Sequence, residues 1–117
     1  WGLAFKPGTD DMREAPSLVL IPKLLAAGAE VVAYDPVAMD EARRRLGGEA
    51  IGYAPDAYSA VLDADALVLL TEWKEFRLPN WELIKRAMRG HVVVDGRNIF
   101  DRSELRALGF DYYGIGV

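Results

Sequence analysis

The chain has 117 residues, of which 51% are hydrophobic and 27% are charged, and it carries a formal net charge of −4. This composition predicts one folded domain over residues 1–117 with a radius of gyration of about 13 Å, and it argues against a disordered chain. The negative charge and the lack of a basic stripe argue against nucleic acid as a partner. The absence of cysteine excludes disulfides and thiol chemistry within the chain. The apolar stretches are too short to cross a bilayer, so we expect no membrane partner and a cytoplasmic location.

The first residues form a short apolar run that ends in Lys6-Pro7-Gly8. This pattern predicts a buried strand over residues 1–5, closed by a turn. The chain lacks an initiator methionine and begins inside the apolar run, so we interpret it as a piece of a longer polypeptide.

The remaining elements follow in regular alternation. A helix is predicted from Pro16 to Gly28, with a kink at Pro22, because a proline inside a helix removes one backbone hydrogen bond. Gly47-Gly48 is expected to end the next helix. The predicted helices after the first cover residues 40–46, 56–62, 81–88 and 102–108, and the predicted strands cover residues 30–34, 50–53, 66–70, 91–94 and 112–115.

This alternation predicts an α/β fold. Continuous apolar strands separated by amphipathic helices are typical of a Rossmann-like, doubly wound, mainly parallel sheet of about six strands, with helices on both faces. If the strand order is 3-2-1-4-5-6, a ligand crevice opens between the first and fourth strands, beyond their carboxyl ends.

The most reactive side chains of the sequence follow the predicted strand ends. Lys6 and Glu72 would flank the crevice, and Arg97 would lie one strand further along. Two cations at a crevice suit a phosphorylated ligand, and Phe5 or Trp73 could stack on a base. A lysine that merely ends a strand in solvent is the alternative for Lys6.

Other motifs limit the chemistry of the chain. No G-x-G-x-x-G follows any predicted strand, and Asp35 resembles the acidic residue of a ribose site but lacks the glycine turn before it. The fold is therefore Rossmann-like without a standard NAD site. His91, the single histidine, has no partner at metal-ligand spacing, so we expect no metal site.

Five blocks of the sequence carry a family resemblance. They are G-L-A-F-K-P-G-T-D-D-M-R-E-A-P-S, G-A-E-V-V-A-Y-D-P, A-D-A-L-V-L-L-T-E-W-K-E-F, V-V-V-D-G-R-N-I-F and G-F-D-Y-Y-G-I-G. In this order they resemble the C-terminal domain of the UDP-glucose/GDP-mannose dehydrogenases over essentially the whole chain.

The resemblance implies a role in an NAD-dependent oxidation of a sugar-nucleotide alcohol to an acid. In that family an N-terminal domain holds NAD, and a central helical region supplies the catalytic cysteine and the dimer contacts. The resemblance therefore implies no catalytic residue in this chain and a homo-oligomer at full length. Phe5, Lys6 and Arg97 match positions that contact the UDP-sugar, and Arg13 matches an arginine that reaches NAD.

Several alternatives remain open from the sequence. Arg13 could be a helix-entry residue paired with Asp10 or Asp11. The sugar nucleotide could be GDP-mannose or UDP-N-acetyl-mannosamine. In a different class, the acidic pair could belong to a non-catalytic receiver module, although Arg97 stands where a receiver needs lysine, and the domain could serve only in assembly.

Overall fold

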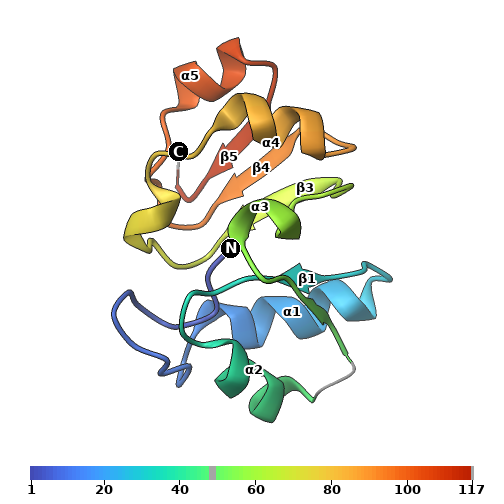
Figure 1. The fold of residues 1–117 in the computed structure, drawn as a ribbon, viewed down its shortest axis with the longest axis vertical. Coiled ribbons are helices and arrows are strands. Elements are labelled where there is room, and N and C mark those ends of the chain that lie inside the picture. The colour runs from blue at the N-terminus through green and yellow to red at the C-terminus, as the bar shows by residue number, and fades with distance from the viewer. Residues whose placement is uncertain (48–49, 117) are drawn as a thin grey trace.

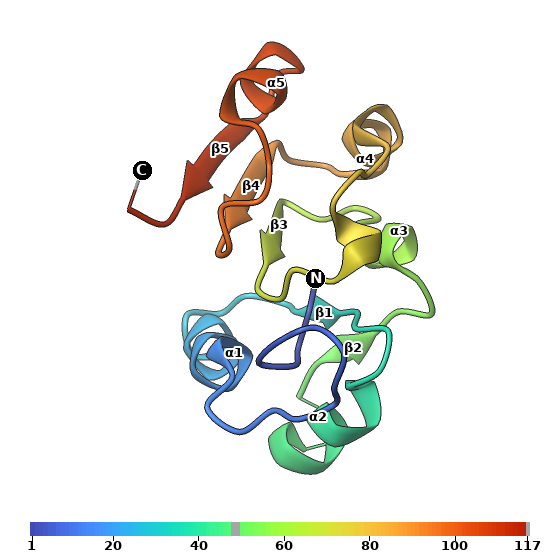
Figure 2. The same ribbon diagram turned by 90° about the vertical axis from the view of Figure 1, so that its left-hand side faces the viewer.

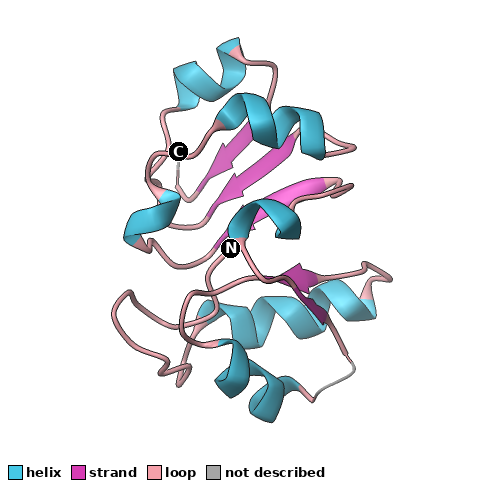
Figure 3. Ribbon diagram, viewed as in Figure 1, coloured by secondary structure: helices cyan, strands magenta, loops and turns pink. Residues whose placement is uncertain are grey.

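Two small parallel sheets lie next to each other in the computed structural model, which describes residues 1–47 and 50–116 (Figures 1 and 3). In the first sheet, β1 (Val32–Ala33) pairs with β2 (Gly52–Tyr53). In the second, β4 (Val92–Asp95) lies between β3 (Ala66–Leu69) and β5 (Asp111–Gly114). The Cα radius of gyration of 13.4 Å agrees with the expected size.

The helices connect these strands in the predicted alternation. They are α1 (Pro16–Ala26), α2 (Met39–Leu46), α3 (Ala57–Ala60), α4 (Trp81–Ala87) and α5 (Arg102–Ala107), with one 3-10 turn, η1 (Lys74–Phe76), that the sequence analysis did not predict. α1 lies on one side of the strands, and α3 and α4 lie on the other (Figure 2). The Rossmann-like α/β fold class is confirmed.

The segment of residues 1–5, called here the first segment, joins the two sheets. The main-chain nitrogen of Trp1 donates to Val68 O at 2.8 Å, and Trp1 O accepts from Leu70 N at 2.9 Å. On the other side, Gly2 N donates to Tyr34 O at 2.8 Å. The first segment therefore lies between β1 and β3. The spatial order is β2, β1, first segment, β3, β4, β5, which is the order 3-2-1-4-5-6 considered in the sequence analysis, where the first segment counted as strand 1.

The prediction of a regular strand over residues 1–5 is wrong beyond this pairing. Gly2 has a φ of +94°, a conformation that ends the extended strand. The next two backbone nitrogens, of Leu3 and Ala4, donate to the side chain of Asp35 and not to a neighbouring strand. The described part of the chain accordingly holds five regular strands and a bridging segment where six strands were expected.

Most other element boundaries differ from prediction by one or two residues. The largest differences are in α3, which is only four residues long, and in β1, which keeps two of five expected residues. Asp56 caps α3 by accepting a hydrogen bond from Ser59 N at 2.8 Å. α2 ends at Leu46, followed by Gly47, and Gly48, predicted to help end it, lies outside the described residues.

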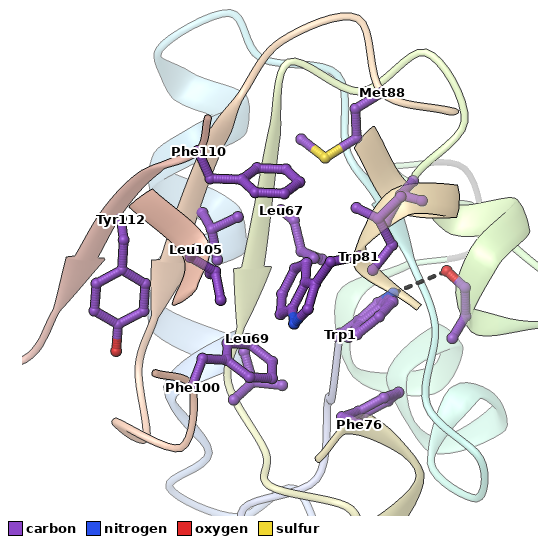
Figure 4. Packing of buried hydrophobic residues seen from close by; sticks show 14 of the residues in the cluster. Trp1, Leu67, Leu69, Phe76, Trp81, Met88, Phe100, Leu105, Phe110 and Tyr112 are labelled. Carbon is purple, nitrogen blue, oxygen red and sulfur yellow. Dashed lines mark hydrogen bonds between the residues drawn. The ribbon is translucent and has the colours of Figure 1, made fainter. Parts of the chain in front are cut away.

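The larger hydrophobic cluster is aromatic and covers β3, β4 and β5 (Figure 4). The Trp1 ring stacks on Phe76 with centroids 4.9 Å apart, and its indole nitrogen donates to Ala57 O at 2.9 Å. The Trp81 ring forms T-shaped contacts with the rings of Phe100 and Phe110, with centroid distances of 4.8 and 5.4 Å. Trp1 thus anchors the first segment to the second sheet.

The smaller cluster lies under α1 and α2 and consists mainly of small side chains. Its buried members are Leu3, Ala4, Met12, Ala15, Ile21, Ala33, Ala38, Ala42 and Ile51. Small side chains let irregular backbone approach closely, which the first segment and the loop after it require. The cluster therefore supports the edge at which the candidate site lies.

Candidate functional site

The candidate site lies where the first segment and β3 end next to each other. Arg97, in the loop after β4, spans both ends with its guanidinium group. Its Nε donates to Leu70 O at 2.8 Å, and its Nη2 donates to Phe5 O at 2.7 Å. Arg97 therefore connects the end of the first segment to the end of β3, a supporting role that the sequence did not predict.

The remaining nitrogen of Arg97 faces Glu72. Nη1 lies 3.9 Å from Oε2 of Glu72, and the two side chains are 27% and 24% exposed. Nε and one N–H of Nη2 are used by the two carbonyl groups. The two N–H groups of Nη1 and the second N–H of Nη2 make no hydrogen bond to a carbonyl group, so a ligand could engage them. The structure thus places a half-buried cation and a half-buried carboxylate together where the first segment and β3 end.

Phe5 and Lys6 lie at the same edge. Phe5 is half-buried and its amide donates to Asp11 O at 3.0 Å, which closes the loop that follows the first segment. Lys6 is exposed, with Nζ 5.4 Å from the centre of the Phe5 ring. Because Arg97 binds the Phe5 carbonyl, the three residues predicted to bind substrate occupy one region.

Arg13 is held on the loop surface by Asp11. Its Nε and Nη2 donate to the two carboxylate oxygens at 2.7 to 3.1 Å, while its side chain is 78% exposed. These hydrogen bonds lower the pKa of Asp11 to about 2. The pairing with Asp11 named as the alternative for Arg13 is confirmed, and the guanidinium keeps Nη1 exposed for another contact.

Asp35 is a structural residue, which corrects its resemblance to a ribose-binding acid. Its side chain is fully buried, and its carboxylate accepts five hydrogen bonds at 2.7 to 3.1 Å. Both oxygens are satisfied by the protein, so no acceptor is left for a ribose. The donors are the backbone nitrogens of Leu3, Ala4, Val37 and Ala38 and the indole nitrogen of Trp73.

Trp73 and Phe5, the two residues expected to stack on a base, are both half-buried. The indole nitrogen of Trp73 donates to Asp35, and its ring packs against both hydrophobic clusters. Phe5 packs against the smaller cluster only.

Asp95 positions the loop that carries Arg97. This buried carboxylate accepts from Arg97 N at 3.1 Å, Phe100 N at 2.8 Å and the Tyr112 hydroxyl at 2.8 Å. Burial and the hydrogen bond to Asp95 raise the pKa of Tyr112 to about 12. The sequence signal was an Asp two residues before Arg97, a spacing that favours a side-chain-to-backbone turn.

No cluster of three or more His, Cys, Asp or Glu side chains suited to a metal ion occurs in residues 1–47 and 50–116. His91 directly precedes β4, as expected for a strand-start residue. None of the helices in these two ranges has the length and apolarity needed to cross a membrane.

Comparison with known proteins gives consistent matches. Residues 1–102 match the model of the UDP-glucose/GDP-mannose dehydrogenase family, UDP binding domain. The chain is 52% identical to the UDP-glucose 6-dehydrogenase of Pseudomonas aeruginosa, over 99% of this chain and 26% of that protein. It is 45% identical to the UDP-glucose 6-dehydrogenase TuaD of Bacillus subtilis, over 98% of this chain and 25% of that protein. The chain therefore spans about a quarter of the length of these relatives.

Solved structures agree in fold. A UDP-D-ManNAc dehydrogenase from Pyrococcus horikoshii superposes with a TM-score of 0.77 at 36% identity, over 98% of this chain and 24% of that one. A UDP-glucose dehydrogenase from Pyrobaculum islandicum gives a TM-score of 0.77 at 34% identity, over 97% of this chain and 23% of that one.

Proposed function

Because the chain belongs to the UDP-glucose/GDP-mannose dehydrogenase family and corresponds to its UDP-binding domain, we propose that it binds the nucleotide half of UDP-glucose. In this proposal residues 1–117 form one domain of a larger UDP-glucose 6-dehydrogenase. The larger enzyme carries out two successive hydride transfers to NAD and yields UDP-glucuronate. NAD and the catalytic groups are held mainly by other domains of the same polypeptide.

One observation carries the proposal: Arg97 joins the ends of the first segment and β3, which are the two neighbouring segments between which the strand order reverses. Parallel α/β sheets bind ligands at such switch points. The Nη1 group of Arg97 and the ammonium of Lys6 would make charge-assisted contacts with the diphosphate. Phe5 lies beside them and would contact the nucleotide.

Arg13 has a separate role in this proposal. Its exposed guanidinium would reach NAD held by a neighbouring domain, while the hydrogen bonds to Asp11 hold the Arg13 side chain in place. Remote binding of the nucleotide would orient the reacting sugar carbon for chemistry in the other domains. The chain alone lacks a glycine-rich NAD turn and any thiol, so we expect no NADH formation from UDP-glucose by the isolated chain.

Relatives of this chain include enzymes named for other sugars, such as UDP-D-ManNAc. UDP-glucose is favoured here because the relatives at 52% and 45% identity are both UDP-glucose 6-dehydrogenases. A receiver module is not favoured, because the Asp11 carboxylate is engaged by Arg13.

The test is to titrate the chain with UDP and with NAD. Binding is measured by calorimetry, or by NMR where it is weak. We expect UDP to bind with an affinity in the range of about 1 mM and NAD to bind more weakly. Lys6→Ala should weaken binding of UDP-glucose by roughly ten- to a hundred-fold, the worth of one charge-assisted contact. Lys23→Ala, which removes the same charge from the last turn of α1, should leave it unchanged.

Arg97 needs a variant that separates binding from folding, because its carbonyl contacts also support the edge. Arg97→Ala should weaken both the binding of UDP-glucose and the stability of the fold. Arg97→Lys should keep the fold and recover only part of the affinity, since an ammonium group cannot reproduce the planar guanidinium group. Unchanged affinity in Lys6→Ala and in Arg97→Lys would contradict the proposed site. Tight NAD binding without any response to UDP would contradict the proposed function.

A further inference from the structure

Glu72 is a half-buried carboxylate beside Arg97, where the first segment and β3 end, and it has no part in the contacts proposed above. It follows the end of β3, and its side chain is 24% exposed. Its nearest charged neighbour is Arg97 Nη1 at 3.9 Å, which is longer than a hydrogen bond. Within residues 1–47 and 50–116 the Glu72 carboxylate accepts no hydrogen bond from the protein, so both of its oxygens are available to a ligand.

The other carboxylates at this edge are used differently. Asp35 and Asp95 are buried and satisfied by backbone and side-chain donors. Asp11 holds Arg13, and Asp10 is exposed on the loop surface. Glu72 therefore stands out as a partly desolvated acceptor beside the cations that would hold a diphosphate.

The charge of Glu72 limits what it could contact. A carboxylate close to a diphosphate is repelled by it and would weaken binding, unless it meets a part of the ligand rich in hydrogen-bond donors. A pair of neighbouring hydroxyl groups offers two donors to the two carboxylate oxygens, as acidic residues bind ribose in dinucleotide sites. A nucleotide sugar carries such pairs on the ribose and on the hexose.

We propose that Glu72 binds a pair of neighbouring hydroxyls of the nucleotide sugar and so determines specificity for that ring. The inference rests on the proposed function of the crevice and adds to it a hydroxyl-binding subsite next to the phosphate-binding cations.

The test compares four ligands on the chain and on its variants by NMR titration: UDP, 2′-deoxy-UDP, UDP-glucose and inorganic pyrophosphate. If the ribose is bound, the wild-type chain prefers UDP over 2′-deoxy-UDP by about ten-fold, the worth of a hydrogen bond to a charged group. If the hexose is bound, it prefers UDP-glucose over UDP by a similar factor. Glu72→Ala should abolish that preference while leaving pyrophosphate binding equal or tighter, because a repelling charge is removed.

Two variants serve as controls. Glu72→Gln should keep part of the preference, because the amide oxygen still accepts a hydrogen bond. Asp10→Ala removes an exposed negative charge from the same edge and should leave the preference intact.

The outcomes separate the two proposals. If Glu72→Ala weakens all four ligands by the same factor, Glu72 only supports the edge and the inference is wrong. If the wild-type preference persists in Glu72→Ala, or if the wild-type chain binds UDP with neither preference, the inference is also wrong while the UDP site stands. If the folded wild-type chain binds none of the four ligands, the proposed function fails, and the inference fails with it.

Discussion

The two sheets of this domain are held together by different physical means. The sheet of β3, β4 and β5 has four-residue strands in continuous parallel register and an aromatic core. The sheet of β1 and β2 has two-residue strands, a core of small side chains, and a first segment fixed by side-chain hydrogen bonds. The difference teaches that the irregular backbone next to the candidate site depends on a few polar side chains, whereas the regular half depends on many apolar contacts.

The strongest way to test this comparison is Asp35→Ala. The substitution leaves four backbone nitrogens and one indole nitrogen without their acceptor. Since each buried unsatisfied donor costs about 1–3 kcal/mol, the five donors together should cost at least about 5 kcal/mol, which a small domain can barely survive. Urea denaturation measures it.

Asp95→Ala is the matched variant in the regular half. It should cost less than Asp35→Ala, because three donors and not five lose their acceptor. A loss for Asp35→Ala no larger than that for Asp95→Ala would break the comparison.

The next largest effect is expected for Gly2→Ala. A Cβ at this position would lie 2.5 Å from Thr71 Cβ and 2.6 Å from Thr71 N, at a φ of +94°. Overpacking and backbone strain together should destabilise the chain by about 3 kcal/mol, measured by thermal or urea unfolding.

Gly28→Ala is the control for backbone strain alone. Gly28 has a φ of +90°, but no atom lies within 4 Å of the added Cβ. It should cost only about 1 kcal/mol. Equal losses in the two variants would mean that the contact between the first segment and Thr71 is not tight.

The smallest effect on folding is expected for Arg13→Ala. The Arg13–Asp11 pair is on the surface and contributes little to stability, so the unfolding midpoint should not change measurably. In the complete dehydrogenase, however, the substitution should raise the Michaelis constant for NAD more than that for UDP-glucose. A clear loss of stability would assign Arg13 to the framework, and an increase confined to UDP-glucose would contradict its proposed role.

The regular half of the fold was well predicted from sequence, because its apolar strands and capped helices carry local signals. The helix at residues 81–87 differs from its predicted bounds by one residue at one end, and the strand at residues 92–95 is shifted by one residue. The first segment was placed in the correct position but given the wrong conformation, since the backbone nitrogens of Leu3 and Ala4 bind the distant side chain of Asp35. Such partners leave no periodic pattern in the sequence.

The candidate site shows the same contrast between local sequence signals, which were predicted, and long-range contacts, which were not. Lys6, Phe5 and Arg97 were expected together because parallel strand ends share an edge, and the structure brings them together. The two carbonyl contacts of Arg97 and the five donors of Asp35 were not foreseen, because they depend on the exact path of the chain. An acidic residue after a strand is a local signal both for a ribose site and for a buried turn, and burial alone separates the two.

The bond between Arg97 and the Phe5 carbonyl has a consequence for folding. It connects residues that are 92 positions apart, and the bond between Trp1 and Val68 spans 67 positions. Contacts of such high sequence separation form late, because the entropy of closing the intervening loop must be overcome first. The crevice is therefore completed only when β4 and the loop after it are in place, and nucleotide binding would serve as a kinetic probe for the final step of refolding.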